Sequence, residues 1–210
     1  MASPKIFLIT PDVADATGFA AKLGPLLSAA KIDAVLLCIT GDEDAVMRAA
    51  KVLVPVVQEA GAAAILNAPA DLRAVARSGA DGAHFPVNAP ALKDALEALK
   101  PARIVGIGGL RTKHEMMDAG ETAIDYLMFG EPREDGSLPE LERVVERVQW
   151  WAEIFNVPCV AYAADLASVP DLAATGADFV ALGTWVFDSA DPAQTLREAV
   201  NLVALAKNTK

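Results

Sequence analysis

The sequence predicts an α/β protein that folds as a single (β/α)8 TIM barrel over residues 1–210. Eight short apolar runs alternate with stretches of helical pattern. The runs are almost continuously apolar, as parallel strands buried on both faces require. The alternative is a doubly wound open sheet, but that architecture more often has five or six strands, so eight βα units favour the barrel.

A recurring sequence pattern marks the connection from a helix to the next strand. At residues 78–86 a serine and Gly79 close a helix, and an apolar run then leads to a polar residue. Glycine suits the left-handed cap after a helix, where a Cβ atom would be unfavourable. Variants of this pattern recur at residues 60–67, 119–130 and 175–183. Four such steps in one chain indicate a repeated βα architecture.

The elements follow in order along the chain. We assign strands to residues 5–10, 32–39, 62–66, 82–85, 103–107, 126–129, 158–162 and 179–182. We assign helices to residues 15–30, 43–60, 70–78, 112–119, 139–155, 165–175 and 191–206, with a further helix starting between Pro86 and Pro90. Asp42 is placed to cap the second helix, residues 112–115 have capping-box spacing, and Asp191 with Pro192 marks the start of the last helix.

Composition limits the class of protein. Apolar residues make up 53% of the 210-residue chain, enough for a large core, but their runs are too short to cross a membrane. The chain starts without an apolar signal region, so we expect a cytoplasmic protein. Cys38 and Cys159 lie in strand-like runs without paired spacing, which favours buried thiols over a metal site, a disulfide or a nucleophile.

The net charge of −10 argues against binding to nucleic acid or to an anionic membrane surface. We therefore expect neither as a partner. A phosphate ligand would need a local positive site made from backbone N–H groups, helix N-termini and a few Lys or Arg side chains.

In a barrel of this kind the functional groups lie on the loops that follow the strands. Phosphate commonly binds after the seventh and eighth strands, which makes Gly183 and Thr184 candidates, although a glycine there also fits a simple turn. His84 could hold a phosphate or move a proton, or it could be a hydrogen-bonded histidine at the barrel rim. Arg111, Lys113 and Arg133 are the cations available on this face, unless they are solvated loop charges.

Acid–base groups and metal ligands are scarce at the predicted strand ends. No pair of carboxylates and no Ser/His/Asp or Cys/His set converges in the sequence pattern. Asp42, Asp71 and Asp165 also fit helix caps or first turns, so the residues predict no metal site. Trp150 and Trp151 favour helix packing or a subunit contact over a stacking site, which leaves a homodimer possible.

Three stretches resemble one known family. Residues 66–67 with 78–85 are similar to its Asn-Asp strand end followed by Gly-Ala-Asp-Gly-Val-His-Leu. Residues 104–109 and 125–130 resemble its fifth and sixth strands, and residues 158–162, 175–183 and 190–192 its last strands and final helix cap. By these motifs the chain resembles the thiamine phosphate synthase and thiazole tautomerase family over residues 5–206.

The resemblance implies a TIM barrel that binds a small phosphorylated ligand. The family reaction condenses hydroxymethylpyrimidine diphosphate with thiazole phosphate in thiamine biosynthesis, a transfer in which Mg²⁺ stabilises the departing pyrophosphate. The candidate substrate- and phosphate-binding residues are Thr40, Asn67, His84, Arg111, Gly130, Arg133, Ala164, Gly183 and Thr184.

Several residues that the family uses for the diphosphate and Mg²⁺ are missing. The family has Gln-x-Arg-x-Lys after its second strand, whereas residues 36–40 carry no charge. The family has two aspartates that bind the metal. At the first of these positions this chain has Ala68, at the second residues 86–89 contain no aspartate, and the family's Thr-x-Thr-Lys is absent from residues 130–137. Where the family has Gly-Gly-Ile after its seventh strand, residues 163–165 have a different sequence. Where the tautomerase has a histidine after its fifth strand, this chain has Gly108 and Gly109.

These departures put the family's Mg²⁺ in doubt and predict weak or no synthase activity. Two other functions stay open. One is a non-catalytic barrel that binds a phosphorylated ligand or a partner. The other is a different small phosphate-binding TIM-barrel enzyme.

Overall fold

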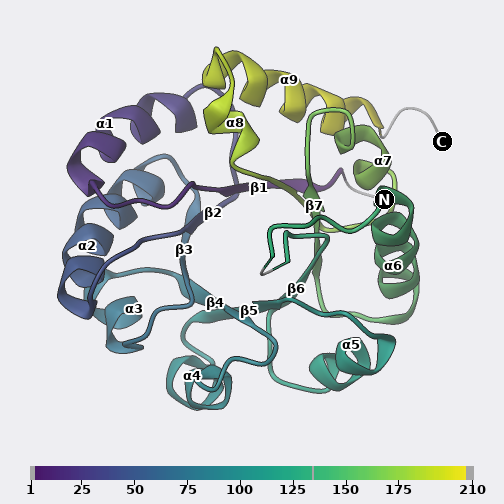
Figure 1. The fold of residues 1–210 in the computed structure, drawn as a ribbon, viewed down its shortest axis with the longest axis horizontal. Helices are drawn as coiled ribbons and strands as arrows, with labels where there is room; N and C mark the ends of the chain where they lie inside the picture. The colour runs from purple at the N-terminus through teal and green to yellow at the C-terminus, as the bar shows by residue number, and fades with distance from the viewer. Residues whose placement is uncertain (1–2, 134, 207–210) are drawn as a thin grey trace.

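The described residues, 3–133 and 135–206 of a computed structural model, form a closed barrel of eight parallel strands in the order β1 to β8 (Figure 1). The predicted fold is thereby confirmed. The strands are β1 (Lys5–Ile9), β2 (Ala34–Leu37), β3 (Ala63–Asn67), β4 (Gly82–Pro86), β5 (Ile104–Gly108), β6 (Tyr126–Phe129), β7 (Cys159–Ala163) and β8 (Phe179–Leu182).

Helices surround the barrel and cover the outer face of its strands (Figure 1). They are α1 (Ala16–Leu27), α2 (Glu43–Glu59), α3 (Arg73–Ser78), α4 (Leu92–Leu99), α5 (Lys113–Gly120), α6 (Leu141–Ile154), α7 (Val169–Ala173), α8 (Trp185–Asp188) and α9 (Pro192–Leu205). The sequence did not predict α8, because four residues are too short to show a helical period.

The predicted helix ends are confirmed by their hydrogen bonds. The side chain of Asp42 accepts from the N–H of Ala45, and Asp191 caps α9 in the same way. Thr112 and Glu115 form both bonds of a capping box at the start of α5. Gly79 has φ 81°, the left-handed geometry expected of a cap glycine.

The predicted bounds of β1 to β5 and of β7 differ from the observed ones by one or two residues, and the difference at the end of β4 concerns a site residue. The fourth strand was expected to end with His84 and Phe85, but β4 continues to Pro86, which pairs with Gly108. The N–H of Val87 extends this ladder by donating to the carbonyl of Gly108 at 2.8 Å. A proline can stand at the end of a strand because its carbonyl remains free to accept. His84 therefore lies within the strand.

Side chains on the strands point alternately into the barrel and out towards the helices, which produces two apolar clusters. The larger cluster joins the outer faces of the strands to the helices. The inner cluster includes Phe7, Leu36, Tyr126, Met128 and Tyr162. These side chains fill the centre of the barrel, so the barrel is a packed core and not an open pore.

Four aspartates connect neighbouring strands at the end of the barrel where the strands begin. Each stands immediately before an even-numbered strand, and its carboxylate accepts a hydrogen bond from an N–H of the preceding odd-numbered strand. The bonds are Ile6 to Asp33 at 3.0 Å, Ala64 to Asp81 at 2.8 Å, Val105 to Asp125 at 2.7 Å and Cys159 to Asp178 at 2.8 Å. We call this arrangement a carboxylate clamp, and it occurs four times around the barrel.

Trp151 confirms the predicted role of the tryptophan pair in helix packing. It is fully buried, stacks on Phe155 with ring centroids 3.9 Å apart, and donates from Nε1 to the carbonyl of Val157. Cys159 is buried as predicted, and Cys38 is half-buried at the mouth. The homodimer stays a prediction. Among the described residues, no helix has the length and apolar character needed to span a membrane.

Loss of one carboxylate clamp is expected to lower the stability of the fold. Asp178→Ala leaves the N–H of Cys159 without its acceptor, so we expect the free energy of unfolding to fall by about 1–3 kcal/mol in a urea titration. Asp188→Ala, which removes an exposed carboxylate at the end of α8, is the control and should change stability by less than about 0.5 kcal/mol. Equal effects of the two substitutions would contradict the clamp.

Candidate functional site

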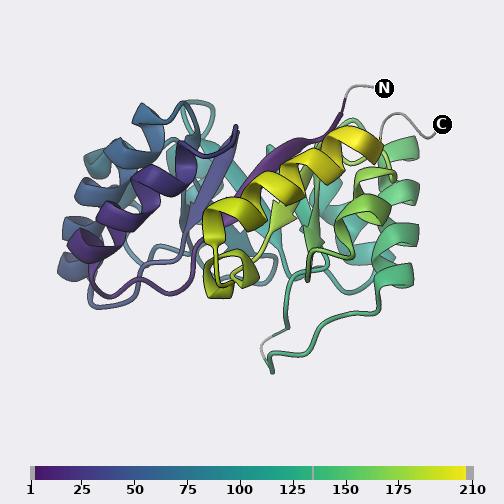
Figure 2. The same ribbon diagram turned by 90° about the horizontal axis from the view of Figure 1, so that it is seen from above.

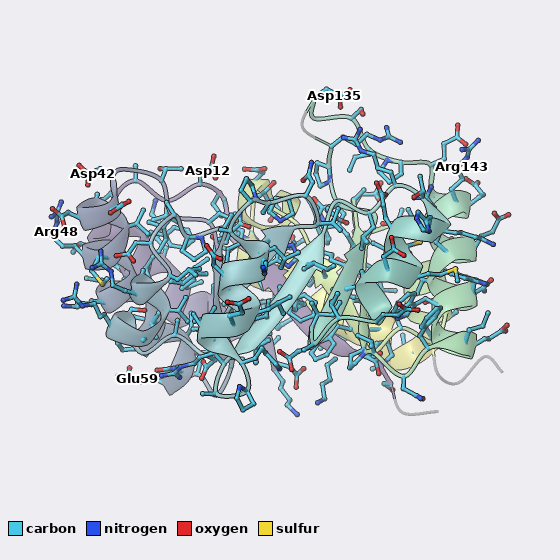
Figure 3. The ribbon with its side chains drawn as sticks, turned by 90° about the horizontal axis from the view of Figure 1, so that it is seen from below. Asp12, Asp42, Arg48, Glu59, Asp135 and Arg143 are labelled. Carbon is cyan, nitrogen blue, oxygen red and sulfur yellow. The ribbon has the colours of Figure 1, made fainter. Side chains whose placement is uncertain are left out.

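A cavity of about 580 Å³ lies at the mouth of the barrel, beside the ends of β3 to β6. The side view shows that the mouth is the face from which the loop between β6 and α6 projects, opposite the chain termini (Figure 2). In Figure 3 the same face carries Asp12, Asp42 and Asp135, while Glu59 marks the opposite one. The polar residues that line the cavity are Asn67, His84, Asn88, Arg111, Glu115, Glu131, Arg133 and Arg147.

Five of the predicted site residues line this cavity. They are Asn67, His84, Arg111, Gly130 and Arg133. Asn67 ends β3 and donates from Nδ2 to Sγ of Cys38 at 3.6 Å. Gly130 has φ 96°, and a Cβ atom there would lie 2.8 Å from Val144, so the turn after β6 requires glycine.

The other four predicted residues do not line the cavity. Thr40 is exposed after β2, and Ala164 is half-buried after β7. Gly183 follows β8 beside the hydroxyl of Tyr162, which occupies the space that a side chain at position 183 would need. Thr184 is exposed at the start of α8. Their assignment to a phosphate site stays a prediction.

Three arginines surround the cavity, one more than the sequence suggested. Arg147 reaches it from α6 and donates to the carbonyl of Arg111 at 2.9 Å. Arg133 donates to Oγ of Ser137 at 2.9 Å within the projecting loop. Sequence reasoning missed Arg147 because it stands in the second turn of a helix, away from any strand end. Three arginines and two glutamates, Glu115 and Glu131, therefore line the same cavity.

His84 is held inside the barrel as a neutral imidazole. Its side chain is buried, and its Nδ1 lies 3.0 Å from the hydroxyl of Tyr126. The two rings are nearly parallel, with centroids 5.6 Å apart. Burial lowers the pKa of His84 to about 4, because the charged ring would lose its hydration. His84 is thus hydrogen-bonded inside the barrel and also lines the cavity, so its assignment to a phosphate or a proton transfer stays a prediction.

Glu131 lines the cavity but was not among the predicted site residues. Its Oε1 accepts a hydrogen bond from the N–H of Gly109, and it lies against the open side of Gly108. Burial raises the pKa of Glu131 to about 7. Glu131 is thus a titratable group at this face that the sequence analysis did not single out. The only signal in the sequence was a carboxylate directly after the glycine that ends the sixth strand, and that pattern is indistinguishable from a solvated loop charge.

Two glycines of β5 make room for these groups. A Cβ atom at Gly106 would overlap the ring of Tyr126. A Cβ atom at Gly108 would lie 2.9 Å from Nε2 of His84 and still closer to Oε1 of Glu131. Glycine at both inward-facing positions therefore allows the tyrosine, the histidine and the glutamate to meet beside one strand.

Comparison with known proteins identifies the family of this chain. The profile of a family described as thiamine monophosphate synthase matches residues 6–186. This chain belongs to that family. Thiamine-phosphate synthase of Rhodospirillum centenum is 35% identical over 190 residues, covering 88% of this chain and 91% of the relative. The enzyme of Hyphomonas neptunium is 30% identical over 205 residues, covering 92% and 90%.

Solved structures share the fold at lower identity. Thiamine phosphate pyrophosphorylase from Pyrococcus furiosus superposes with a TM-score of 0.78 at 18% identity, covering 97% of each chain. KGPDC from Streptococcus mutans gives 0.76 at 13% identity, covering 98% of this chain and 99% of the other. A 3-hexulose-6-phosphate synthase gives 0.73 at 15% identity, covering 93% and 98%. At these identities the likeness concerns the barrel alone.

The donors at the mouth do not fit the Mg²⁺ that the family uses. Mg²⁺ prefers ionised carboxylates. Of the two carboxyl groups that line the cavity, one is already hydrogen-bonded to backbone N–H groups and the other has a raised pKa. Glu115 accepts from the N–H groups of Arg111 and Thr112, and the pKa of Glu131 favours its neutral form below pH 7. Within residues 3–133 and 135–206, no three His, Cys, Asp or Glu side chains converge as a metal site.

The raised pKa of Glu131 predicts how stability varies with pH. The folded protein holds this proton up to about pH 7, whereas an ordinary glutamate releases it near 4.5, so the free energy of unfolding falls as pH rises between these values. Glu131→Gln avoids the ionisation. We expect urea titrations to show the variant about 1–3 kcal/mol more stable than the parent protein at pH 8, and equal to it at pH 4. A difference that is independent of pH would contradict the raised pKa of Glu131.

Proposed function

We propose that this member of the thiamine monophosphate synthase family binds a small phosphorylated ligand in the mouth cavity, and that its synthase activity is weak or absent. The observation that supports this function is the convergence of Arg111, Arg133 and Arg147 on one cavity. The same cavity holds Asn67 and His84, which can donate hydrogen bonds to the rest of a ligand.

Arginine is suited to this role because its planar guanidinium binds two oxygens of a phosphate at once. The protein as a whole has a net charge of −10, so a phosphate would be repelled elsewhere on its surface. A cluster of three guanidinium groups from α6 and from the loops after β5 and β6 overcomes this repulsion locally.

The residues at the mouth argue against the magnesium-dependent transfer. A diphosphate with its metal would need cations after β2 and two aspartates, whereas residues 36–40 are uncharged and residue 68 is an alanine. Glu131, when it ionises, would add negative charge beside the ligand. Departure of pyrophosphate would therefore receive little stabilisation.

Ligand-induced stabilisation tests this function directly. We expect thiazole phosphate or thiamine phosphate, at about 100 times its dissociation constant, to stabilise the protein by about 2.7 kcal/mol and to raise the melting temperature by several degrees. Aminopyrimidine diphosphate with Mg²⁺ should give no shift. A shift with all three compounds, together with turnover to thiamine phosphate, would contradict the proposed loss of activity.

The arginine site predicts a position-specific effect on α6. Arg147→Gln should weaken binding of the phosphorylated ligand about tenfold or more, because a charged hydrogen bond is lost. Arg143→Gln is the matched control: Arg143 lies one turn earlier on α6 and pairs at the surface with Glu140 at 3.7 Å. Calorimetric titration of both variants should find weaker binding in Arg147→Gln alone. Equal loss in the two variants would indicate general electrostatic attraction.

A further inference from the structure

A second cavity lies at the base of the barrel, the end where the strands begin, opposite the mouth. Its volume is about 190 Å³. Apolar side chains that point into the barrel make up most of its wall, and they include Phe7, Ile65, Ile104, Tyr126, Val160 and Phe179. Within the part of the chain that the structure describes, the base cavity and the mouth cavity share no lining residue. The base cavity is therefore a separate site.

Two alanines leave the space that the base cavity occupies. Ala34 begins β2 and Ala63 begins β3, and the two residues are direct partners in the register of these parallel strands. Both line the cavity. Inward positions of a barrel of this kind are usually filled by bulky side chains. A pair of methyl groups on adjacent strands therefore leaves a hollow beside the aromatic rings.

Three aromatic side chains form one part of the cavity wall. The ring centroid of Phe7 lies 5.6 Å from that of Tyr126 and 6.2 Å from that of Phe179, which it meets almost at a right angle. A further flat ring can stack on these rings or meet their edges at similar spacings. An apolar cavity of about 150 Å³ is large enough to bind benzene. The base cavity, at about 190 Å³, can therefore hold one six-membered ring with a small substituent.

The rim of the base cavity carries one cation without an acidic partner. Nζ of Lys5 lies over the ring of Phe179, 5.6 Å from its centroid, and no carboxylate of the described residues pairs with it. Asp33 is the acidic residue at the rim, but it accepts from the N–H of Ile6 at 3.0 Å and lies 3.7 Å from Nζ of Lys31. The rim therefore offers one available positive charge beside an aromatic wall.

We propose that the base cavity binds a small aromatic carboxylate, with its ring among the three aromatic side chains and its carboxylate at Lys5. Burial of the ring removes apolar surface of the ligand and of the cavity from water. The ammonium group of Lys5 can donate a charge-assisted hydrogen bond to the carboxylate. The site does not depend on the phosphate binding proposed for the mouth.

Titration of the full chain with benzoate, followed by NMR of its methyl groups, tests this site. We expect a dissociation constant of about 1 mM or lower for a ligand of this size. The methyl signals of Ile65, Ile104 and Val160 should shift, whereas those of Val87 and Leu110, which line the mouth cavity, should not. Benzyl alcohol, which has the ring without the charge, should bind more weakly. Acetate, which has the charge without the ring, should leave the base signals unchanged.

Two substitutions separate the roles of shape and charge. Ala63→Leu should weaken benzoate binding by about tenfold or more, because the larger side chain occupies the hollow. Lys5→Gln should weaken it by about fivefold and leave the binding of benzyl alcohol unchanged, because only the charge at the rim is lost. Lys22→Gln is the matched control, since Lys22 is an exposed lysine on α1 away from the cavity, and it should bind benzoate as the parent does.

Thermal melting of each variant checks that it is folded, and Lys5→Gln changes an exposed side chain, so it stays informative if Ala63→Leu lowers stability. Three results would overturn the proposal: shifts confined to the mouth, parent-like affinity for benzoate in either variant, or no binding at about 10 mM. Any of them would leave an apolar hollow that the stem of Lys5 merely covers. None would affect the function proposed for the mouth, which is tested with phosphorylated compounds.

Discussion

The carboxylate clamps at the base of the barrel are the constraint on which the rest of the structure depends. Asp33, Asp81, Asp125 and Asp178 each fix the N–H of an odd-numbered strand to the start of the next strand. Because side chains alternate along a strand, a shift of one residue would turn every inward side chain outward. The clamps therefore help determine that Tyr126 and His84 point into the barrel and that the strand ends meet at one mouth.

The arrangement of side chains at the mouth depends on two positions of β5 that have no side chain. Glycine at positions 106 and 108 leaves space that Tyr126, His84 and Glu131 occupy from the neighbouring strands and loop. This crowding removes water, and the loss of hydration shifts the pKa of histidine down and that of glutamate up. Two groups with ordinary properties in water thus become a neutral base and a weak acid at the same place.

The chain shares the thiamine monophosphate synthase profile over residues 6–186, so its scaffold is that of the family. Residues 36–40 at the end of β2 are uncharged, and Arg111, Arg133 and Arg147 line the cavity beside β5, β6 and α6. Residues at the mouth of a barrel can vary because its loops carry little of the stability that its base and core provide.

The sequence by itself determined the barrel and many helix ends, because strand burial, capping aspartates and left-handed glycines leave local patterns that Asp42, Thr112 and Gly79 display. It also indicated five cavity residues, since the ends of parallel strands must share one edge. Tertiary structure alone decided that Arg147 and Glu131 belong to the site. Arg147 reaches the cavity from a helix, and the raised pKa of Glu131 comes from burial by groups distant in the sequence, so neither leaves a pattern in the spacing of the chain.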